Sequence, residues 1–211
     1  MNKYNTNMTS SHQSGYLEII LGSMFSGKST RLVEIYKQCE FCNISVAVIN
    51  HTIDNRYDEE LLVTHDQIKI PCIKTTNLSD IWTDYTLIDP NVDMPRIADK
   101  FKLSTSDVIL INEGQFFEDL YEVVVEMLKR DKKVYICGLD GDFERKKFGR
   151  ILDLIPLCDK VTKLTSLCSL CKNGTPGIFS MRLTPETNQT VVGSENYIPV
   201  CRKCYSNKNN Q

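Results

Sequence analysis

Short runs of apolar, often β-branched residues recur along the chain and predict buried strands. The runs are LEIIL (17–21), SVAVIN (45–50), VILIN (108–112) and KVYICGL (133–139). Each is apolar at consecutive positions, which is typical of strands covered on both faces. Helix-compatible segments lie between several of them, most clearly 28–42 and 118–130. Alternating strands and helices predict an α/β fold, with a parallel sheet that carries helices on both faces.

The pattern changes twice along the chain. Segment 51–106 is less regular, and we expect one or two strands, a short helix and loops there. From about residue 161 cysteine pairs and Gly and Pro turns replace the apolar runs. We therefore expect a nucleotide-binding domain over 15–160 and a small second domain over 161–205. The polar ends, 1–14 and 206–211, are predicted to be disordered tails.

Composition excludes several classes of protein. The 211 residues are 41% hydrophobic and carry a net charge of −2, so nothing predicts binding to a nucleic-acid backbone. No apolar run approaches the roughly 18 residues of a membrane span. The N-terminal segment lacks the apolar core of a secretion signal, and the nine cysteines are odd in number. We expect a reducing, cytoplasmic location rather than a disulfide-bonded secreted protein.

GSMFSGKS (22–29) matches the phosphate-binding pattern G-x-x-x-x-G-K-[ST], between a predicted strand and a predicted helix. Glycines let the backbone N–H groups turn toward phosphate oxygens, and the helix adds its positive N-terminal end. Lys28 is predicted to reach the β and γ phosphates, and the Ser29 hydroxyl to bind Mg²⁺. The expected phosphate-binding residues are Gly22, Ser23, Met24, Phe25, Ser26, Gly27, Lys28, Ser29 and Thr30.

The strand VILIN ends on an amide, and a carboxylate follows it. In a phosphate-binding fold a second strand commonly ends in an acid that supports Mg²⁺. Here Asn112 occupies that place and Glu113 comes one residue later. Glu113 could be a metal ligand, a base that accepts a proton from an attacking hydroxyl, or a solvated carboxylate at a strand end. Adjacent strand residues face opposite ways, so the two side chains are expected to act differently.

Two C-x-x-C pairs in the small domain predict a structural zinc site with four thiolate ligands. They are separated by a long segment that the metal would tie at both ends, and the ligands would be Cys168, Cys171, Cys201 and Cys204. A third pair, Cys39 and Cys42, has no second pair nearby and is expected to be buried free cysteine. The remaining cysteines are expected in the core: Cys72, Cys137 and Cys158.

The phosphate cradle, EGQFF (113–117), LDGDFERKKFG (139–149) and the four cysteines together resemble one family. It is the zinc-containing thymidine kinase of cytosolic vertebrate, bacterial and large-DNA-virus enzymes. The resemblance covers about Gly15 to Tyr205. It implies a RecA-like P-loop fold and transfer of phosphate from ATP to thymidine, with deoxyuridine also accepted. It further implies Mg²⁺, structural Zn²⁺, inhibition by thymidine triphosphate, a homotetramer and a cytoplasmic location.

The resemblance also implies residue roles. Glu113 would be the general base, and IDNRY (53–57) would supply Asp54 to Mg²⁺ and Arg56 to phosphate and catalysis. Asn112 and Gln115 would lie on the ATP side. The loop TVVGSENYIPVC (190–201) would close over thymine. The implied thymidine-site residues are Met24, Phe116, Leu139, Phe143, Ser180, Val191, Val192, Gly193 and Tyr197, with Arg182 as a further candidate.

Two features depart from the family pattern. Asn112 stands where the family has Asp, which shifts the expected Mg²⁺ support to Ser29 and Asp54. Restoring the carboxylate with Asn112→Asp would then lower the Mg²⁺ requirement. The connection from 65 to 107 is longer than the family suggests, and its segment WTDYTLIDPNVDMPRIADK (82–100) is expected to be a surface excursion.

Two other functions fit part of the sequence. A zinc-bearing P-loop ATPase acting on a protein or nucleic-acid partner would explain the cradle and the cysteines. The neutral charge balance and the absence of a basic aromatic stripe speak against it. A metal-stabilised binding module without catalysis would explain the missing strand-end Asp. Phosphorylation of a labelled nucleoside would distinguish the kinase from both.

Overall fold

A computed structural model describes residues 14–54, 61–64, 66–82, 94–191 and 193–208. Its centre is a sheet of six described strands, all parallel to their neighbours. In spatial order these are β5 (Ile73–Thr75), β2 (Val46–His51), β6 (Val108–Ile111), β7 (Lys133–Gly138), β1 (Tyr16–Gly22) and β8 (Lys160–Leu164). The expected α/β fold is confirmed.

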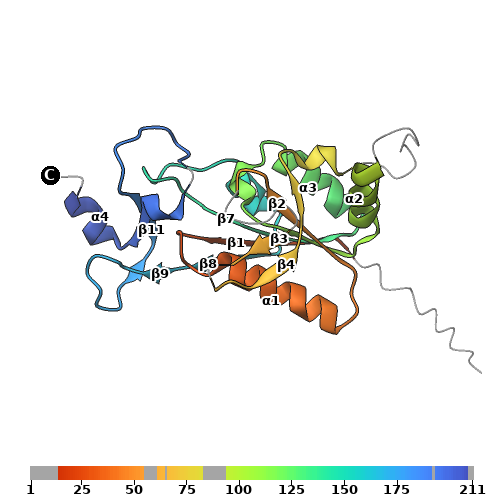
Figure 1. Ribbon diagram of the computed structural model, residues 1–211, viewed down its shortest axis with the longest axis horizontal. Coiled ribbons are helices and arrows are strands. Elements are labelled where there is room, and N and C mark those ends of the chain that lie inside the picture. Colours follow the sequence, from red (N-terminus) through yellow and green to blue (C-terminus); the bar gives the residue numbers. More distant parts are fainter. Residues whose placement is uncertain (1–13, 55–60, 65, 83–93, 192, 209–211) are drawn as a thin grey trace, which may run out of the picture.

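The strands alternate their side chains between two hydrophobic cores, as the pleat requires. In β6, Ile109 and Ile111 face one core, whereas Val108 and Leu110 face the other. The first core is covered by α3 (Leu120–Lys129), α2 (Met94–Thr105) and the 3-10 helices η1 (Leu78–Asp80) and η4 (Ile151–Leu157). The second is covered by α1 (Lys28–Phe41) and the hairpin β3 (Leu61–Val63) and β4 (Lys69–Pro71). Figure 1 shows α1 on one side of the sheet and α2 and α3 on the other.

Segment 51–106 contains more regular structure than its polar composition predicted. Besides β3, β4 and β5 it forms the twelve-residue α2, which begins within the expected surface excursion 82–100. Trp82 packs against the first core and Leu103 is fully buried in it. Trp82 is one end of the expected excursion 82–100, whereas Leu103 lies three residues beyond its other end. Residues 83–93 lie outside the described part of the chain, so the surface excursion stays a prediction.

The small domain consists of short antiparallel pairs and one helix. Strand β9 (Ser166–Leu167) pairs with β10 (Pro176–Gly177), and β11 (Phe179–Arg182) pairs with β12 (Tyr197–Val200). The 3-10 helix η5 (Ser194–Asn196) precedes β12, and α4 (Arg202–Lys208) follows it. In Figure 1 this domain lies at the end of the sheet opposite α2.

Three details differ from expectation. Strand β8 pairs with β1 and carries the central sheet to Leu164, past the boundary expected after residue 160. It was missed because it is an edge strand without a fully buried position. Helix α4 reaches Lys208, so the first residues of the expected tail 206–211 are helical. Cys42 is exposed and Cys158 only partly buried, whereas both were expected inside.

No described helix combines the length and apolar character needed to cross a membrane. The remaining residues of the expected tails, 1–13 and 209–211, lie outside the described part of the chain.

Candidate active site

The phosphate cradle joins the end of β1 to the start of α1. Gly22 passes so close to β8 that a Cβ there would lie 2.5 Å from the Leu164 carbonyl oxygen. Gly27 has a φ of 84°, a left-handed conformation that costs glycine little, and it caps α1. Lys28 is 8% exposed, and its Nζ donates to the Ser23 carbonyl at 2.8 Å. The cradle thus presents a cation and the positive end of a helix together.

Glu113 lies where β6 turns away from the sheet. Its φ of 53° is left-handed, which is uncommon for a residue with a side chain and is typical of functional turns. Gln115 Nε2 donates to the Glu113 carboxylate at 2.7 Å, while Gln115 Oε1 accepts from the Leu139 N–H at 3.0 Å. The backbone contact sets which end of the amide faces Glu113. Gln115, predicted on the ATP side, therefore contacts the candidate base directly.

Asn112 points the other way, into the protein. It is 2% exposed, and its Oδ1 lies 3.3 Å from the Ser29 Oγ. Its Nδ2 donates to Asn50 Oδ1 at 2.9 Å, and Asn50 Nδ2 donates to Asp54 at 3.2 Å. Asn50 was missed by sequence reasoning. The available signal was that it ends the run SVAVIN as Asn112 ends VILIN, and these strands pair with Ile49 opposite Ile111.

Aromatic rings border the pocket beyond Glu113. Phe116 meets Phe148 edge-on, with ring centroids 5.5 Å apart. Phe148 was not singled out from the sequence, although it belongs to the FG pair of LDGDFERKKFG. His51 lies behind, its centroid 5.6 Å from that of Phe116, and burial lowers the pKa of the imidazole. The neutral ring adds to an apolar wall that suits a flat heterocycle.

The segment leading to residue 191 is held by one buried arginine. Arg182 is 7% exposed and donates to the carbonyls of Glu186, Asn188 and Gln189 at 2.9, 2.5 and 2.9 Å. It also donates to the Tyr197 hydroxyl at 2.6 Å. Its guanidinium carbon lies 3.7 Å from the Phe143 ring centroid. Arg182 therefore links this loop to an aromatic side chain of the nucleotide-binding domain.

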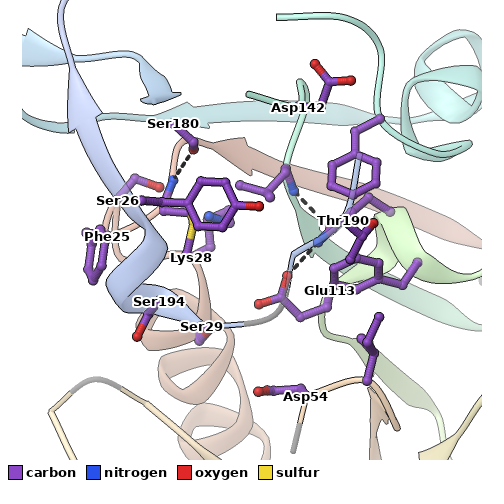
Figure 2. A pocket seen from close by; sticks show the side chains of 18 of the residues that line it. Phe25, Ser26, Lys28, Ser29, Asp54, Glu113, Asp142, Ser180, Thr190 and Ser194 are labelled. Carbon is purple, nitrogen blue, oxygen red and sulfur yellow. Dashed lines mark hydrogen bonds between the residues drawn. The ribbon is translucent and has the colours of Figure 1, made fainter. Parts of the chain in front are cut away.

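These elements meet in a single pocket (Figure 2). Ser29, Asp54 and Glu113 border the same part of it, and Ser180 lies on the far side, where its Oγ accepts from the Met24 N–H at 2.9 Å. Gly22, Ser23, Asn112 and Arg182 do not border it, and Arg56 and Val192 lie outside the described residues. The other predicted phosphate and thymidine residues all line it: Met24, Phe25, Ser26, Gly27, Lys28, Thr30, Gln115, Phe116, Leu139, Phe143, Val191, Gly193 and Tyr197.

The two C-x-x-C pairs converge, as their spacing predicted. The sulfur atoms of Cys168, Cys171, Cys201 and Cys204 all lie within 4.8 Å of one another. Tetrahedral zinc with bonds of about 2.3 Å places its sulfurs about 3.8 Å apart, which lies within this limit. The donor set and its geometry therefore fit a structural metal. The other pair, Cys39 and Cys42, is not part of any such group among the described residues.

Comparisons with known proteins agree with this geometry. A family model described as thymidine kinase matches residues 15–205. A thymidine kinase of Oryza sativa subsp. japonica is 39% identical over 199 residues, covering 90% of this chain and 66% of the plant protein. Thymidine kinase a of Arabidopsis thaliana is 40% identical over 197 residues, covering 91% and 75%. A thymidine kinase of Sheeppox virus is 38% identical over 192 residues, covering 90% and 97%. The chain belongs to the thymidine kinase family.

Membership in the thymidine kinase family excludes the non-catalytic binding module and makes the P-loop ATPase the weaker interpretation. It also suggests a role in metal binding for the oxygen donors that border the pocket. Ser29 supplies a hydroxyl and Asp54 a carboxylate, and Mg²⁺ prefers such hard oxygen ligands. The donor set therefore fits the Mg²⁺ that a kinase binds with ATP.

Proposed function

We propose that this protein transfers the γ-phosphate of ATP to the 5′-hydroxyl of thymidine, and more slowly of deoxyuridine. The observation that carries the proposal is the convergence on one pocket of a phosphate cradle, a fixed carboxylate, aromatic rings and a loop from the four-cysteine domain. The cradle suits a triphosphate, whereas the aromatic part suits a nucleobase. Glu113 lies between these two parts, where a sugar hydroxyl would meet the γ-phosphate.

On the ATP side the protein acts by positioning and by neutralising charge. Backbone N–H groups of the cradle and the N-terminus of α1 would bind the β and γ phosphates, with Lys28 against the oxygens on which charge develops. Ser29 and Asp54 would hold Mg²⁺, which neutralises charge on the β and γ oxygens. Arg56 stays a predicted phosphate ligand and catalytic residue.

On the acceptor side Glu113 is the proposed base. Its carboxylate accepts the proton of the 5′-hydroxyl as O5′ forms a bond to the γ-phosphorus. The bond from that phosphorus to the β–γ bridging oxygen breaks, and ADP leaves with the electron pair. Gln115 holds the carboxylate by a single donated hydrogen bond, and its own oxygen is occupied by the Leu139 N–H. This contact orients the carboxylate that would accept the proton.

Base selection is assigned to the loop over 189–197. Arg182 donates to two backbone carbonyls just before this loop and to that of Gln189 within it, and the Tyr197 hydroxyl bonds both the N–H and the carbonyl of Val191. A backbone held in this way cannot turn over to exchange a donor for an acceptor. Thymine and uracil present the same hydrogen-bonding edge, whereas cytosine reverses it. A reversed edge leaves buried groups unpaired, at about 1–3 kcal/mol for each.

The test is the kcat/KM of thymidine, deoxyuridine and deoxycytidine with ATP and Mg²⁺ under one set of conditions. Deoxyuridine should be weaker than thymidine by roughly 10- to 200-fold, since a methyl group in an apolar pocket has about that effect. Deoxycytidine should be weaker by roughly 10² to 10⁴. Comparable values for thymidine and deoxycytidine would contradict backbone selection and indicate a broad deoxynucleoside kinase. No nucleoside monophosphate from any substrate would contradict the proposed function itself.

Three further properties are proposed from the family alone. They are inhibition by thymidine triphosphate, assembly into a homotetramer and a cytoplasmic location. Zinc is the metal proposed for the four-cysteine cluster.

A further inference from the structure

A chain of hydrogen bonds connects the two proposed Mg²⁺ ligands through the interior of the protein. Ser29 Oγ contacts Asn112 Oδ1 at 3.3 Å, Asn112 Nδ2 contacts Asn50 Oδ1 at 2.9 Å, and Asn50 Nδ2 contacts Asp54 Oδ2 at 3.2 Å. The four residues come from α1, the end of β6, β2 and the turn after β2. These side-chain bonds join residues from three elements, in addition to the backbone bond from the Asn112 N–H to the Ile49 carbonyl at 2.9 Å.

The direction of each bond in this chain is determined by chemistry. Asn112 Oδ1 accepts from the Ser29 hydroxyl and also from the Cys137 thiol, at 2.9 Å. Burial raises the pKa of Cys137 to about 12, so its sulfur keeps the proton that it donates. The NH₂ group of Asn112 must then face Asn50. Asn50 presents its oxygen to that group and its own NH₂ to the Asp54 carboxylate, which can only accept when ionised.

Both amides lie almost out of contact with water. Asn50 is 1% exposed and Asn112 is 2% exposed. A buried amide that loses its partner cannot recover a hydrogen bond from solvent, so each member depends on the next. The Ser29 hydroxyl donates its hydrogen to Asn112 Oδ1, so the lone pairs of the hydroxyl oxygen remain available to bind a cation.

We propose that Asn50 and Asn112 are an uncharged pair of positioning residues, which hold Ser29 and Asp54 in place for the magnesium–nucleotide complex. The inference rests on the proposed function, because it concerns the metal that accompanies ATP. Neither amide lines the pocket. They act by orienting the serine hydroxyl and the aspartate carboxylate from behind, at the adjacent ends of β6 and β2.

This changes the expected effect of restoring a carboxylate with Asn112→Asp. An ionised carboxylate has no proton to donate, so one of its oxygens would face Asn50 Oδ1. If Asn50 rotated to donate to it, the Asn50 oxygen would face the Asp54 carboxylate instead. In the first case Asn50 Oδ1 loses the N–H that it accepts from, and in the second case Asp54 loses the hydrogen bond from Asn50. We therefore expect weaker binding of magnesium–nucleotide, opposite to the expectation from the family pattern.

The test compares the affinities for ADP with Mg²⁺ and for ADP with excess chelator, measured by titration calorimetry. Asn50→Ala and Asn112→Ala should each weaken binding of magnesium-ADP about tenfold, as expected for one lost buried hydrogen-bonding partner. Both should leave metal-free ADP within about twofold, because the substitutions remove neither Lys28 nor the backbone N–H groups that bind phosphate. The double variant should be no weaker than about tenfold, since the two residues act as one unit. Asn77→Ala, at an exposed asparagine of the same domain, is the matched control.

Two results would overturn the positioning role. One is an equal loss with and without Mg²⁺, and the other is a double variant near the hundredfold product of independent effects. If the alanine variants unfold, Asn50→Asp takes their place, because it keeps the shape of the side chain. It should also weaken the binding of magnesium-ADP, because the new carboxylate would face that of Asp54. A gain in magnesium-ADP affinity for Asn112→Asp would likewise contradict the pair.

A second measurement separates this inference from the proposed function. In the nucleotide-free protein the side-chain amide protons of Asn50 should exchange with solvent at least about tenfold more slowly than those of exposed Asn77, as seen by NMR. Asn112→Asp should accelerate that exchange. Failure to bind any ADP would contradict the kinase assignment, whereas fast exchange of the Asn50 amide in the parent would contradict the hydrogen-bonded pair.

Discussion

At the scale of single residues, Glu113 carries the largest expected effect on the reaction. Glu113→Gln retains an oxygen that can accept from Gln115 but removes the proton acceptor. We expect kcat to fall on the order of 10² or more, with the affinity for ATP largely unchanged. Initial rates and nucleotide titrations measure the two effects. Glu118→Gln, at an exposed glutamate five residues later, should leave both unchanged. A kcat within a few-fold of the parent would instead support the solvated carboxylate.

Sequence reasoning found the groups of residues that are neighbours along the chain. The cradle and the Asn112–Glu113 strand end are local patterns, and the structure places them side by side through the contact of Ser29 with Asn112. Asn50 and Phe148 depend on which strands and loops become neighbours. The sequence of either strand alone does not show that β2 pairs with β6. The contact of Asn112 with Asn50 could therefore be found only from the arrangement of the strands in the sheet.

At the scale of elements, the central strands of the sheet were predictable from the sequence and the edge strand β8 was not. β1, β2, β6 and β7 have long apolar runs because both of their faces are covered. β8 lies at the edge with exposed and half-buried positions, so it lacks that signal. The sheet therefore extends four residues into the range 161–205 that was predicted as the four-cysteine domain with its substrate-covering loop.

The loop before β12 gives a prediction at this scale. Arg182→Lys keeps the charge but loses the planar fork that contacts three carbonyls, a hydroxyl and a ring at once. We expect kcat/KM for thymidine to fall roughly 10- to 100-fold, since each hydrogen bond to a charged group contributes about 1.5–3 kcal/mol. KM for ATP should change less than about threefold, because the cradle does not contact Arg182. Steady-state rates with each substrate varied provide both values.

The control for Arg182 is Arg202→Lys in the same domain. Arg202 is exposed and lies 5.2 Å from the Phe179 ring centroid, so it shares the stacking but not the buried contacts. It should leave both substrates within about twofold of the parent. If Arg202→Lys lowered thymidine kcat/KM as much as Arg182→Lys, a general loss of domain stability would explain the effect, and the specific role of Arg182 would be wrong.

At the scale of the whole molecule, the four-cysteine domain and the sheet share one site. Ser23 Oγ donates to the Gly177 carbonyl at 2.8 Å, and Ser180 accepts from the Met24 N–H at 2.9 Å. The Tyr205 hydroxyl of α4 donates to the Phe143 carbonyl at 2.6 Å. The domain therefore touches the cradle at two points, and it fixes the aromatic part of the pocket by Tyr205 and Arg182 together.

The domain depends on its cysteines because it has little other core. Its buried hydrophobic cluster has five members, and two of them are the ligand residues Cys168 and Cys201. Thiolate coordination would supply much of its folding free energy. Cys168→Ser, or removal of zinc from the parent, should weaken thymidine binding more than tenfold. ADP binding should fall only about two- to threefold, since the cradle would lose just its two contacts with the domain.

Thermal unfolding distinguishes this loss from global damage. We expect the small domain to melt early, while the parallel sheet keeps a separate transition close to that of the parent. Cys42→Ser changes an exposed cysteine far from the cluster and should alter neither transition nor affinity. Equal losses of ADP and thymidine affinity would contradict the division of labour between the two parts. Metal analysis of fresh, reduced and active protein should find about one zinc per chain. Far less than one would contradict the proposed zinc site, because the protein would then be active without the metal.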